Sequence, residues 1–339
     1  MSLLFCDSFD HYATADINTK WTGNQVASIS ASGRNGTSAF YGNYQNCYMY
    51  KALPVSSSTL IAGFAHYGSS FTGSNTLVSF YDGTTAHVHL RYTTSGLVLY
   101  QGNGTVLGST AYVVLGASWR YIELKATIAD GTGGSAEVRV NGEPVITVTG
   151  VDTRNGGNAS ANTVYLGQLD GVNGMGSFYY DDFYVCNDQG SVNNNFLGDV
   201  RVECLRPTDN GASSMWLGSD GNSVNNYALV DEVTPNGDTD YVASANVGDV
   251  DSYTMGNLST PSGTVYGVQQ LQYARKDYSG TRGIAPVVRI GGTDYVGTNA
   301  PIGDSYLYYG QVRETSPATS TSWSILEIND AEFGVKVTS

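Results

Sequence analysis

Residues 119–150 read WRYIELKATIADGTGGSAEVRVNGEPVITVTG, and this stretch decides the fold. Apolar and polar residues alternate along WRYIELKATI, SAEVRV and EPVITVT, which is the pattern of strands with one buried face. Glycine, asparagine and aspartate separate these runs, and Asn141-Gly142 is a typical two-residue hairpin turn. The stretch therefore predicts three antiparallel strands joined by tight turns.

The same pattern recurs along the whole chain of 339 residues. Charged residues make up only 14% of the sequence, whereas 42 glycines and 25 tyrosines are present. Helix surfaces usually carry Lys, Glu, Arg and Ala, while Gly, Ser, Thr, Asn, Val and Tyr are typical of strands and turns. The composition therefore predicts an all-β protein whose strands pack as β-sandwiches.

The length of the chain and a change of pattern predict two domains. After the strand FYYDDFYVC, the sequence NDQGSVNNNFLGD has no hydrophobic alternation, and a second series of strand patterns begins at DVRVECLRP. We therefore expect two β-sandwich (jelly-roll) domains in tandem, residues 1–190 and residues 191–339, with an exposed connector between them.

One short segment near the C-terminus has the features of a helix. In TSWSILEINDAEF, Ser324 is a candidate N-cap and Glu327 its partner in a capping box. The apolar residues of this segment should cover the end of the second sandwich, namely Trp323, Ile325, Ile328 and Phe333. We expect the tryptophans to lie in the two cores, Trp21 and Trp119 in the first, Trp216 and Trp323 in the second.

The chain is acidic, with 16 Lys and Arg against 30 Asp and Glu and a formal net charge of −14. Because nucleic-acid binding requires basic surfaces, this balance argues against a nucleic-acid partner. No run approaches the roughly 20 apolar residues that span a bilayer, and the start MSLLFCDSFD has no basic segment and no long apolar segment. We therefore expect no membrane association and synthesis in the cytoplasm without a signal peptide.

Signatures of common enzyme classes are missing from the sequence, including G-x-S-x-G, G-x-x-x-x-G-K-S/T and H-E-x-x-H. His87 and His89 share one face of a predicted strand, a spacing that suits a metal, but no third ligand is evident and a solvent-facing or hydrogen-bonded pair is the favoured interpretation. Asp181 and Asp182 are adjacent in a strand and should face opposite ways, which disfavours a catalytic pair. We expect a buried aspartate that accepts hydrogen bonds from backbone amides, and we assign no catalytic or cofactor-binding residue.

Three clusters of acidic and amide residues leave room for a structural calcium ion. They are Asp220-Gly221-Asn222, Asp238-Thr239-Asp240 and Asp249-Val250-Asp251. None has the spacing of an EF-hand, and side chains that accept hydrogen bonds from turn amides are the simpler interpretation. We expect no cofactor, and the metal content stays open.

Tyrosines concentrate in three groups along the chain. The groups are Tyr41/Tyr44/Tyr48/Tyr50, Tyr179/Tyr180/Tyr184 and Tyr306/Tyr308/Tyr309. A ring with a polar tip suits protein interfaces, sugar-binding surfaces and packed cores alike, so all three uses stay open.

The segments LLFCDSFDHY, WRYIELKATI followed by SAEVRVNGEPV, and FYYDDFYVCND resemble a concanavalin A/laminin-G-like jelly roll over residues 1–190. In that family the first and last strands are neighbours, and a V-x-V-N-G hairpin links two strands, here at Val138, Val140, Asn141 and Gly142. The resemblance implies a scaffold and leaves the ligand open.

The jelly-roll resemblance also bears on the cysteines, which are Cys6, Cys47, Cys186 and Cys204 and show no C-x-x-C spacing. Cys6 lies in the first predicted strand and Cys186 in the last strand of the first domain. If these strands are neighbours, Cys6 and Cys186 form either a close pair of reduced thiols, which we favour, or a disulfide.

Residues 191–339 contain GDVRVECLRP, LQYARKDYSGTRGIAPVVRIGGTDY and WSILEINDAEFGVKV and resemble sandwich modules of tailed-bacteriophage virion proteins. This resemblance implies a non-enzymatic capsid-decoration or tail-associated protein, located in the virion. Its partners would be other virion proteins and further copies in a homo-oligomer. Two alternatives are kept: a lectin-like carbohydrate-binding module that attaches to a host surface glycan and, less favoured because paired carboxylates are missing, a glycoside hydrolase.

Overall fold

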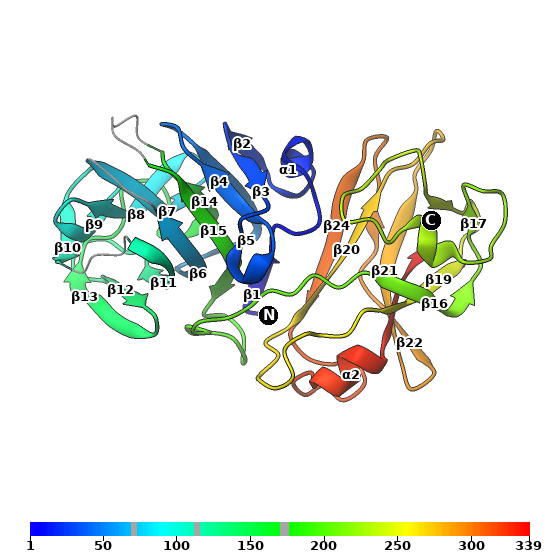
Figure 1. Ribbon diagram of the computed structural model, residues 1–339. Coiled ribbons are helices and arrows are strands. Elements are labelled where there is room, and N and C mark those ends of the chain that lie inside the picture. The colour runs from blue at the N-terminus through cyan, green and yellow to red at the C-terminus, as the bar shows by residue number, and fades with distance from the viewer. Residues whose placement is uncertain (69–72, 112–115, 170–175) are drawn as a thin grey trace. The chain divides into compact units, whose positions relative to one another are not determined.

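The computed structural model describes four stretches of the chain, residues 1–68, 73–111, 116–169 and 176–339 (Figure 1). Within them the helical segments are short: α1 (Ile17–Lys20), α2 (Ile325–Asp330) and the 3-10 turns η1 (Thr14–Asp16), η2 (Arg34–Gly36) and η3 (Asn226–Leu229). None of the helices in these stretches is long and apolar enough to cross a bilayer. The rest of the regular structure is β, which confirms the predicted fold class.

The chain divides into two compact units, Met1–Val202 and Glu203–Ser339. The first unit is a jelly-roll β-sandwich of two antiparallel sheets. The eight-stranded sheet has the order β13-β12-β11-β6-β15-β4-β3, with β1 paired to β15. Its strands are β1 (Leu3–Asp7), β3 (Ser28–Ser30), β4 (Ala39–Gly42), β6 (Thr59–Gly68), β11 (Gly116–Thr127), β12 (Gly134–Val140), β13 (Glu143–Val151) and β15 (Phe178–Asn187).

The second sheet of this unit has seven strands in the order β10-β9-β8-β7-β14-β5-β2. The strands are β2 (Gly23–Gln25), β5 (Tyr48–Ser57), β7 (Ser74–Asp82), β8 (Thr85–Thr93), β9 (Gly96–Gln101), β10 (Val106–Thr110) and β14 (Ala161–Gly167).

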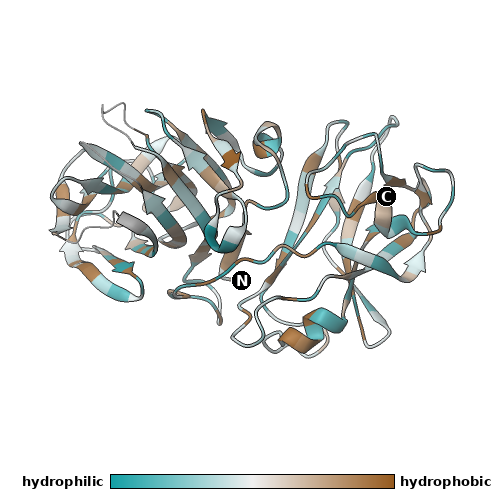
Figure 2. Cartoon of the chain, viewed as in Figure 1, coloured by the Kyte–Doolittle hydropathy of each residue, from teal (hydrophilic) through white to brown (hydrophobic). Residues whose placement is uncertain are grey.

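The core of the first unit lies between the two sheets. Phe40 and Phe64 of the eight-stranded sheet pack against the ring of Tyr180, at centroid distances of 5.3 and 5.1 Å. The Tyr180 hydroxyl donates to the carbonyl of Leu77 on the other sheet, 3.1 Å away, and so ties the two layers together. Strand alternation brings these residues inward, and Figure 2 shows hydrophobic and hydrophilic segments within single strands.

The first and last strands of the unit are neighbours, as the jelly-roll resemblance implies. Phe5 of β1 lies opposite Val185 of β15. The turn between β12 and β13 has φ of 51° at Asn141 and 84° at Gly142, the left-handed conformation that a two-residue hairpin of this type requires. Both expectations are confirmed.

Cys6 and Cys186 lie on these neighbouring strands without being opposite each other. Cys6 is opposite Tyr184, and Cys186 is opposite Leu3. All four cysteines are free thiols in the structure. Burial raises the pKa of the Cys6 thiol to about 11, which keeps it protonated at neutral pH.

The connector after β15 belongs to the first unit, so the units divide at Val202 and not at residue 190 as expected. Gly198 donates its backbone N–H to Glu123 Oε1 at 2.9 Å. Val202 donates its backbone N–H to Asp182 Oδ1 at 2.8 Å. The sequence of the connector lacks a strand pattern, but polar side chains of the eight-stranded sheet hold its backbone in place.

The second unit is built on a six-stranded sheet of order β16-β19-β25-β21-β22, with β23 paired to β21. Two ribbons, β17–β18 and β20–β24, complete it. Gln270 of the second ribbon donates to the carbonyls of Val287 and Gly334 in the sheet, which fixes the two layers together. The strands are β16 (Pro207–Ser214), β17 (Leu217–Gly218), β18 (Val242–Ala243), β19 (Val250–Met255), β20 (Val268–Ala274), β21 (Gly283–Ile290), β22 (Thr293–Val296), β23 (Ala300–Pro301), β24 (Leu307–Arg313) and β25 (Glu332–Val337).

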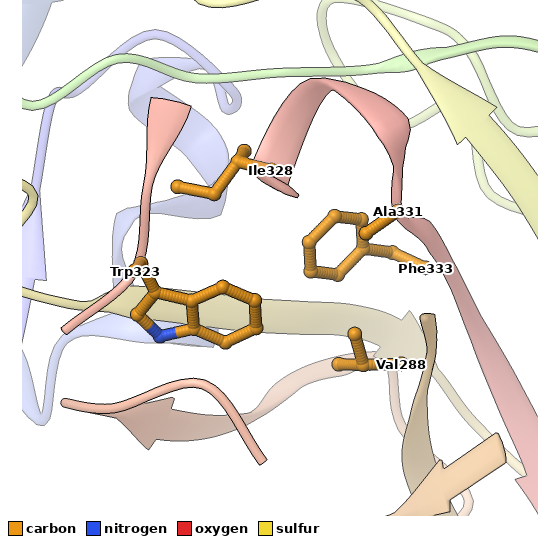
Figure 3. Close-up of a cluster of buried hydrophobic side chains, with 5 residues drawn as sticks. All are labelled: Val288, Trp323, Ile328, Ala331 and Phe333. Atoms are coloured by element: carbon orange, nitrogen blue, oxygen red, sulfur yellow. The ribbon is translucent and has the colours of Figure 1, made fainter. Parts of the chain in front are cut away.

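Helix α2 begins at the predicted cap, where Ser324 Oγ accepts a hydrogen bond from the Glu327 amide at 3.1 Å. Figure 3 shows the side chains that converge beneath it, namely Val288, Trp323, Ile328, Ala331 and Phe333. Ile325 was expected in this cluster but is only half-buried, because it occupies the first turn at the open end of the helix.

The tryptophans divide between core and surface. Trp21 and Trp323 are buried, as expected. Trp119 and Trp216 are half-buried, which corrects the expectation that they belong to the cores. Trp119 lies near the start of β11, on the face of the sheet that points away from the core, where its ring contacts Tyr67.

Candidate functional site

The outer face of the seven-stranded sheet gathers polar and aromatic side chains. Val78, Phe80 and Val88 point into the core and are fully buried. Because successive side chains of a strand point to opposite faces, Ser79 and His89 point to the outer face, where neighbouring side chains bury both of them.

A line of five residues crosses this face perpendicular to the strands. Each residue is directly opposite the next in the register of β5, β14, β7, β8 and β9, which are consecutive in the sheet. In this order they are Tyr50, Tyr165, Ser79, His89 and Tyr100, and we call them the polar row. Since neighbouring strands lie about 4.8 Å apart, the polar row is about 19 Å long.

Tyrosine rings pack together at one end of the polar row. The Tyr50 and Tyr165 rings are nearly parallel, with centroids 4.8 Å apart and an interplanar angle of 17°. Tyr81 and Tyr48 add rings at 4.5 and 5.6 Å from Tyr165. Burial raises the pKa of Tyr165, and the neighbouring Tyr50 and Tyr48 raise it further by a smaller amount. The Tyr165 hydroxyl therefore stays protonated. Because the ring faces contact each other, the cluster offers ring edges and hydroxyl groups to a ligand.

Basic side chains occupy the other end of the polar row. Ser79 Oγ and His89 Nδ1 share a hydrogen bond of 2.7 Å, which fixes the orientation of the imidazole. The Tyr81 ring meets the imidazole edge to face at 5.8 Å. Arg91, two residues further along β8, holds its guanidinium 5.1 Å from the centre of the Tyr100 ring. Imidazole and guanidinium groups on one face can hydrogen-bond hydroxyls or carboxylates.

His87 lies on the same strand as His89 but has a different partner. Its Nδ1 accepts a hydrogen bond from the Asn155 amide at 3.1 Å, and burial lowers its pKa. The interpretation of His87 and His89 as hydrogen-bonded side chains is confirmed. Within the described stretches, no three His, Cys, Asp or Glu side chains are grouped so as to hold a metal ion.

Asp181 and Asp182 lie on the eight-stranded sheet, where they hold backbone amides as expected. Asp181 Oδ2 accepts from the Arg34 amide at 2.7 Å, and Asp182 Oδ1 from the Val202 amide at 2.8 Å. Burial raises the pKa of Asp181 to about 8 and that of Asp182 to about 6. These hydrogen bonds give both carboxyl groups a structural role.

The acidic clusters of the second unit also accept hydrogen bonds from within the unit. Asp220 Oδ1 accepts from the Asn222 amide at 3.2 Å, which is the turn interaction expected from the sequence. Asp249 Oδ2 accepts from the Ser244 hydroxyl at 2.6 Å, and Asp238 Oδ1 from the Tyr306 hydroxyl at 2.7 Å.

The polar row was not found from the sequence, because β5 and β14 are separated in the chain from the consecutive strands β7, β8 and β9. Two signals were present. Tyr48 and Tyr50 are two residues apart on one strand, as are His87 and His89 on another, so each pair shares a face. Members of these pairs join one row only because of the order of the strands in the sheet, which the sequence pattern does not give.

No protein-family model matches the chain, and no curated protein matches it. Among solved structures, the chain is similar to an endo-β-1,4-glucuronan lyase from the fungus Trichoderma reesei, at 14% identity over 52% of this chain and 94% of that chain, with a TM-score of 0.40. It is also similar to a cellulose-induced protein, at 14% identity over 55% and 94% of the two chains, with a TM-score of 0.39. An alginate lyase from Aplysia kurodai matches at 14% identity over 47% and 86%, with a TM-score of 0.38.

These similarities contradict the expectation of a bacteriophage virion structural protein, whether capsid-decorating or tail-associated. The structures are two polysaccharide lyases and a cellulose-induced protein. The expectation rested on a resemblance of β-sandwich sequences, and a β-sandwich serves many unrelated functions. The prediction of a virion role is therefore wrong.

Proposed function

We propose that the first unit binds a polysaccharide chain along the polar row. The observation that carries this proposal is the line of Tyr50, Tyr165, Ser79, His89 and Tyr100 across five consecutive strands. A linear polymer is best matched by an extended surface with hydrogen-bonding groups at regular intervals, and the spacing of strands supplies such intervals.

The side chains of the polar row are held in place before a ligand arrives. Ring contacts fix Tyr165 between Tyr50 and Tyr81, and the hydrogen bond to Ser79 fixes His89. Each side chain that is already ordered avoids an entropy cost of about 0.5–1.5 kcal/mol on binding. A hydroxyl-rich polymer can therefore gain net affinity from many modest hydrogen bonds.

Retardation of the full chain in native gels that contain soluble polysaccharides, both neutral and uronate-containing, tests the proposal. Tyr165→Ala removes the ring that three other tyrosines contact, so we expect affinity to fall at least about tenfold, equivalent to about 1.4 kcal/mol. The matched control is Tyr44→Ala, because the Tyr44 side chain is 60% exposed and lies outside the polar row.

The control should bind as the wild type does. The proposal is wrong if the wild-type chain is not retarded by any polysaccharide, or if Tyr165→Ala is retarded to the same extent. Circular dichroism of each variant shows whether the sandwich is retained.

Cleavage of the bound chain is a second candidate function, favoured by the position of one group. His89 is oriented by Ser79, and Arg91 lies two residues further along the same strand. On a uronate polymer, a general base takes the proton from the carbon next to the carboxylate, the electron pair forms a double bond, and the glycosidic oxygen leaves and takes a proton from solvent water. A guanidinium stabilises the charge that develops.

The ultraviolet absorbance of unsaturated sugar ends tests this second candidate. If His89 is the base, wild-type protein should generate the absorbance on a polyuronate, and His89→Ala should abolish it even at polymer concentrations at which gel retardation, although weakened, is still observed. Retardation without any absorbance change would leave binding as the function of the polar row.

A further inference from the structure

The outer face of the eight-stranded sheet carries a second line of side chains. Tyr179 of β15 is directly opposite both Tyr67 of β6 and Tyr41 of β4. The ring centroids of these two pairs are 5.8 and 4.9 Å apart. Trp119 of β11 extends the line, 5.8 Å from Tyr67. We call these four half-buried residues the aromatic row.

The rings of the aromatic row meet at steep angles. The interplanar angles are 48° between Trp119 and Tyr67, 66° between Tyr67 and Tyr179, and 40° between Tyr179 and Tyr41. Tilted rings do not cover each other's faces as parallel rings do, so part of each ring face is available. The row itself contains no charged side chain, and the Tyr41 hydroxyl hydrogen-bonds the Ser177 hydroxyl at 3.2 Å.

Another part of this outer face is covered by the chain itself. Residues 195–202, which we call the docked segment, bind the polar side chains there. The Tyr184 hydroxyl donates to Glu123 Oε1 at 2.5 Å and accepts from the Leu197 amide at 3.1 Å. The docked segment thus covers Glu123 and Tyr184, while the aromatic row is left half-exposed.

We propose that the aromatic row binds a neutral polysaccharide chain, so that the first unit holds a chain on each of its two outer faces. A sugar ring presents C–H groups that pack on aromatic faces and hydroxyls that hydrogen-bond phenols. The row offers no cation to a carboxylate or phosphate. A second copy of this protein is a poor occupant, because two chains of net charge −14 repel each other.

The aromatic row is independent of the polar row. The two rows lie on opposite faces of the sandwich, whose sheets are about 10 Å apart, so a ligand on one face does not block the other. A protein with both rows intact would link two polysaccharide chains.

Gel retardation in a series of neutral polysaccharides, namely β-glucan, mannan, xylan and arabinan, tests this inference. The double variant Tyr67→Ala with Tyr179→Ala should lose at least about tenfold in affinity for the neutral polymer that retards the wild type most. Tyr165→Ala should retain part of that retardation, since it leaves the aromatic row intact. Tyr44→Ala is the control for a lost tyrosine elsewhere on the unit.

A second measurement does not depend on the folding of the double variant. The neutral polymer should shift the tryptophan emission of the wild-type chain, and Trp119→Phe should remove that shift. The inference is overturned if no neutral polymer retards the wild type, or if the double variant behaves as the wild type. It is also overturned if Tyr165→Ala alone abolishes all binding, a result that would still support the polar row.

Discussion

The two outer faces of the first unit share a geometric arrangement of side chains but differ in the chemistry of those side chains. Both place side chains in a line across strands, the polar row on the seven-stranded sheet and the aromatic row on the eight-stranded sheet. The polar row includes His89 and lies beside Arg91, whereas the aromatic row holds no charged group.

The two faces differ in the burial and hydrogen bonding of their charged side chains. On the eight-stranded sheet, Glu123 and Asp182 are buried under the docked segment and accept its amide hydrogen bonds. On the seven-stranded sheet, Arg91 stays half-exposed beside Tyr100. Glu123 and Asp182 therefore stabilise the fold on one face, whereas Arg91 is partly exposed on the other. Four predictions separate these roles, given in order of expected effect.

The largest effect is expected from the titration of the covered carboxyl groups. Burial raises the pKa of Asp181 from 3.8 to about 8. A pKa that is higher in the folded state contributes stability that is complete below the unfolded-state pKa and is lost as pH rises through the folded-state pKa. The first unit should therefore lose stability between about pH 4 and about pH 8, by up to about 1.4 kcal/mol per pH unit.

Urea unfolding at a series of pH values measures this dependence. Asp181→Asn should flatten the slope, because the neutral amide does not titrate. Asp130→Asn is the control, since Asp130 is an exposed carboxylate that pairs with Arg154, and it should keep the wild-type slope. An unchanged slope in Asp181→Asn contradicts the prediction.

Arg34→Ala should give the next largest effect. The Arg34 guanidinium lies 3.2 Å from the carboxylate of Asp182 and 2.7 Å from that of Asp199. Its removal leaves Asp182 buried without its cation, so we expect a loss of about 3 kcal/mol in the unfolding free energy. Arg139→Ala removes a more exposed pair with Glu137 and should cost less than about 1 kcal/mol.

A matched pair of tyrosine variants compares covered and open positions on one strand. Tyr184→Phe removes the buried hydrogen bond to Glu123 and leaves that carboxylate under the docked segment, so a loss of about 2 kcal/mol is expected. Tyr179→Phe lies in the aromatic row and should change stability by less than about 0.5 kcal/mol. Hydrogen exchange of the β15 amides measures both values. Equal losses would mean that the two halves of the face are not distinct.

The smallest effect is expected from two serines that hydrogen-bond members of the rows. Ser79→Ala removes the hydroxyl that orients His89 and should cost about 1 kcal/mol of stability, together with a several-fold loss of polysaccharide affinity. Ser177→Ala removes the hydroxyl beside Tyr41 and should cost less, since this hydrogen bond is only partly buried. Urea unfolding and gel retardation distinguish the two. A larger loss for Ser177→Ala would reverse the comparison.

Local sequence patterns were sufficient for much of the fold. Alternation along residues 134–140 matches the burial of β12, Asn141-Gly142 forms the expected hairpin, and Ser324 caps α2. Each of these features depends on residues that are close in sequence, so backbone preferences and the alternation of strand side chains determine them. The sequence also led us to expect a buried aspartate in the Asp181-Asp182 pair that binds backbone amides, but it did not identify the amides, which belong to Arg34 and Val202.

Tertiary structure alone decided which residues meet. Tyr50, Tyr165 and His89 form one row because β5, β14, β7 and β8 are neighbours in the sheet, and that order depends on how the two sheets pack. Attachment of the docked segment likewise depends on carboxylates from β11 and β15. A strand's own residues determine which of its faces is buried, whereas the register between distant strands is determined by the packing of the whole core.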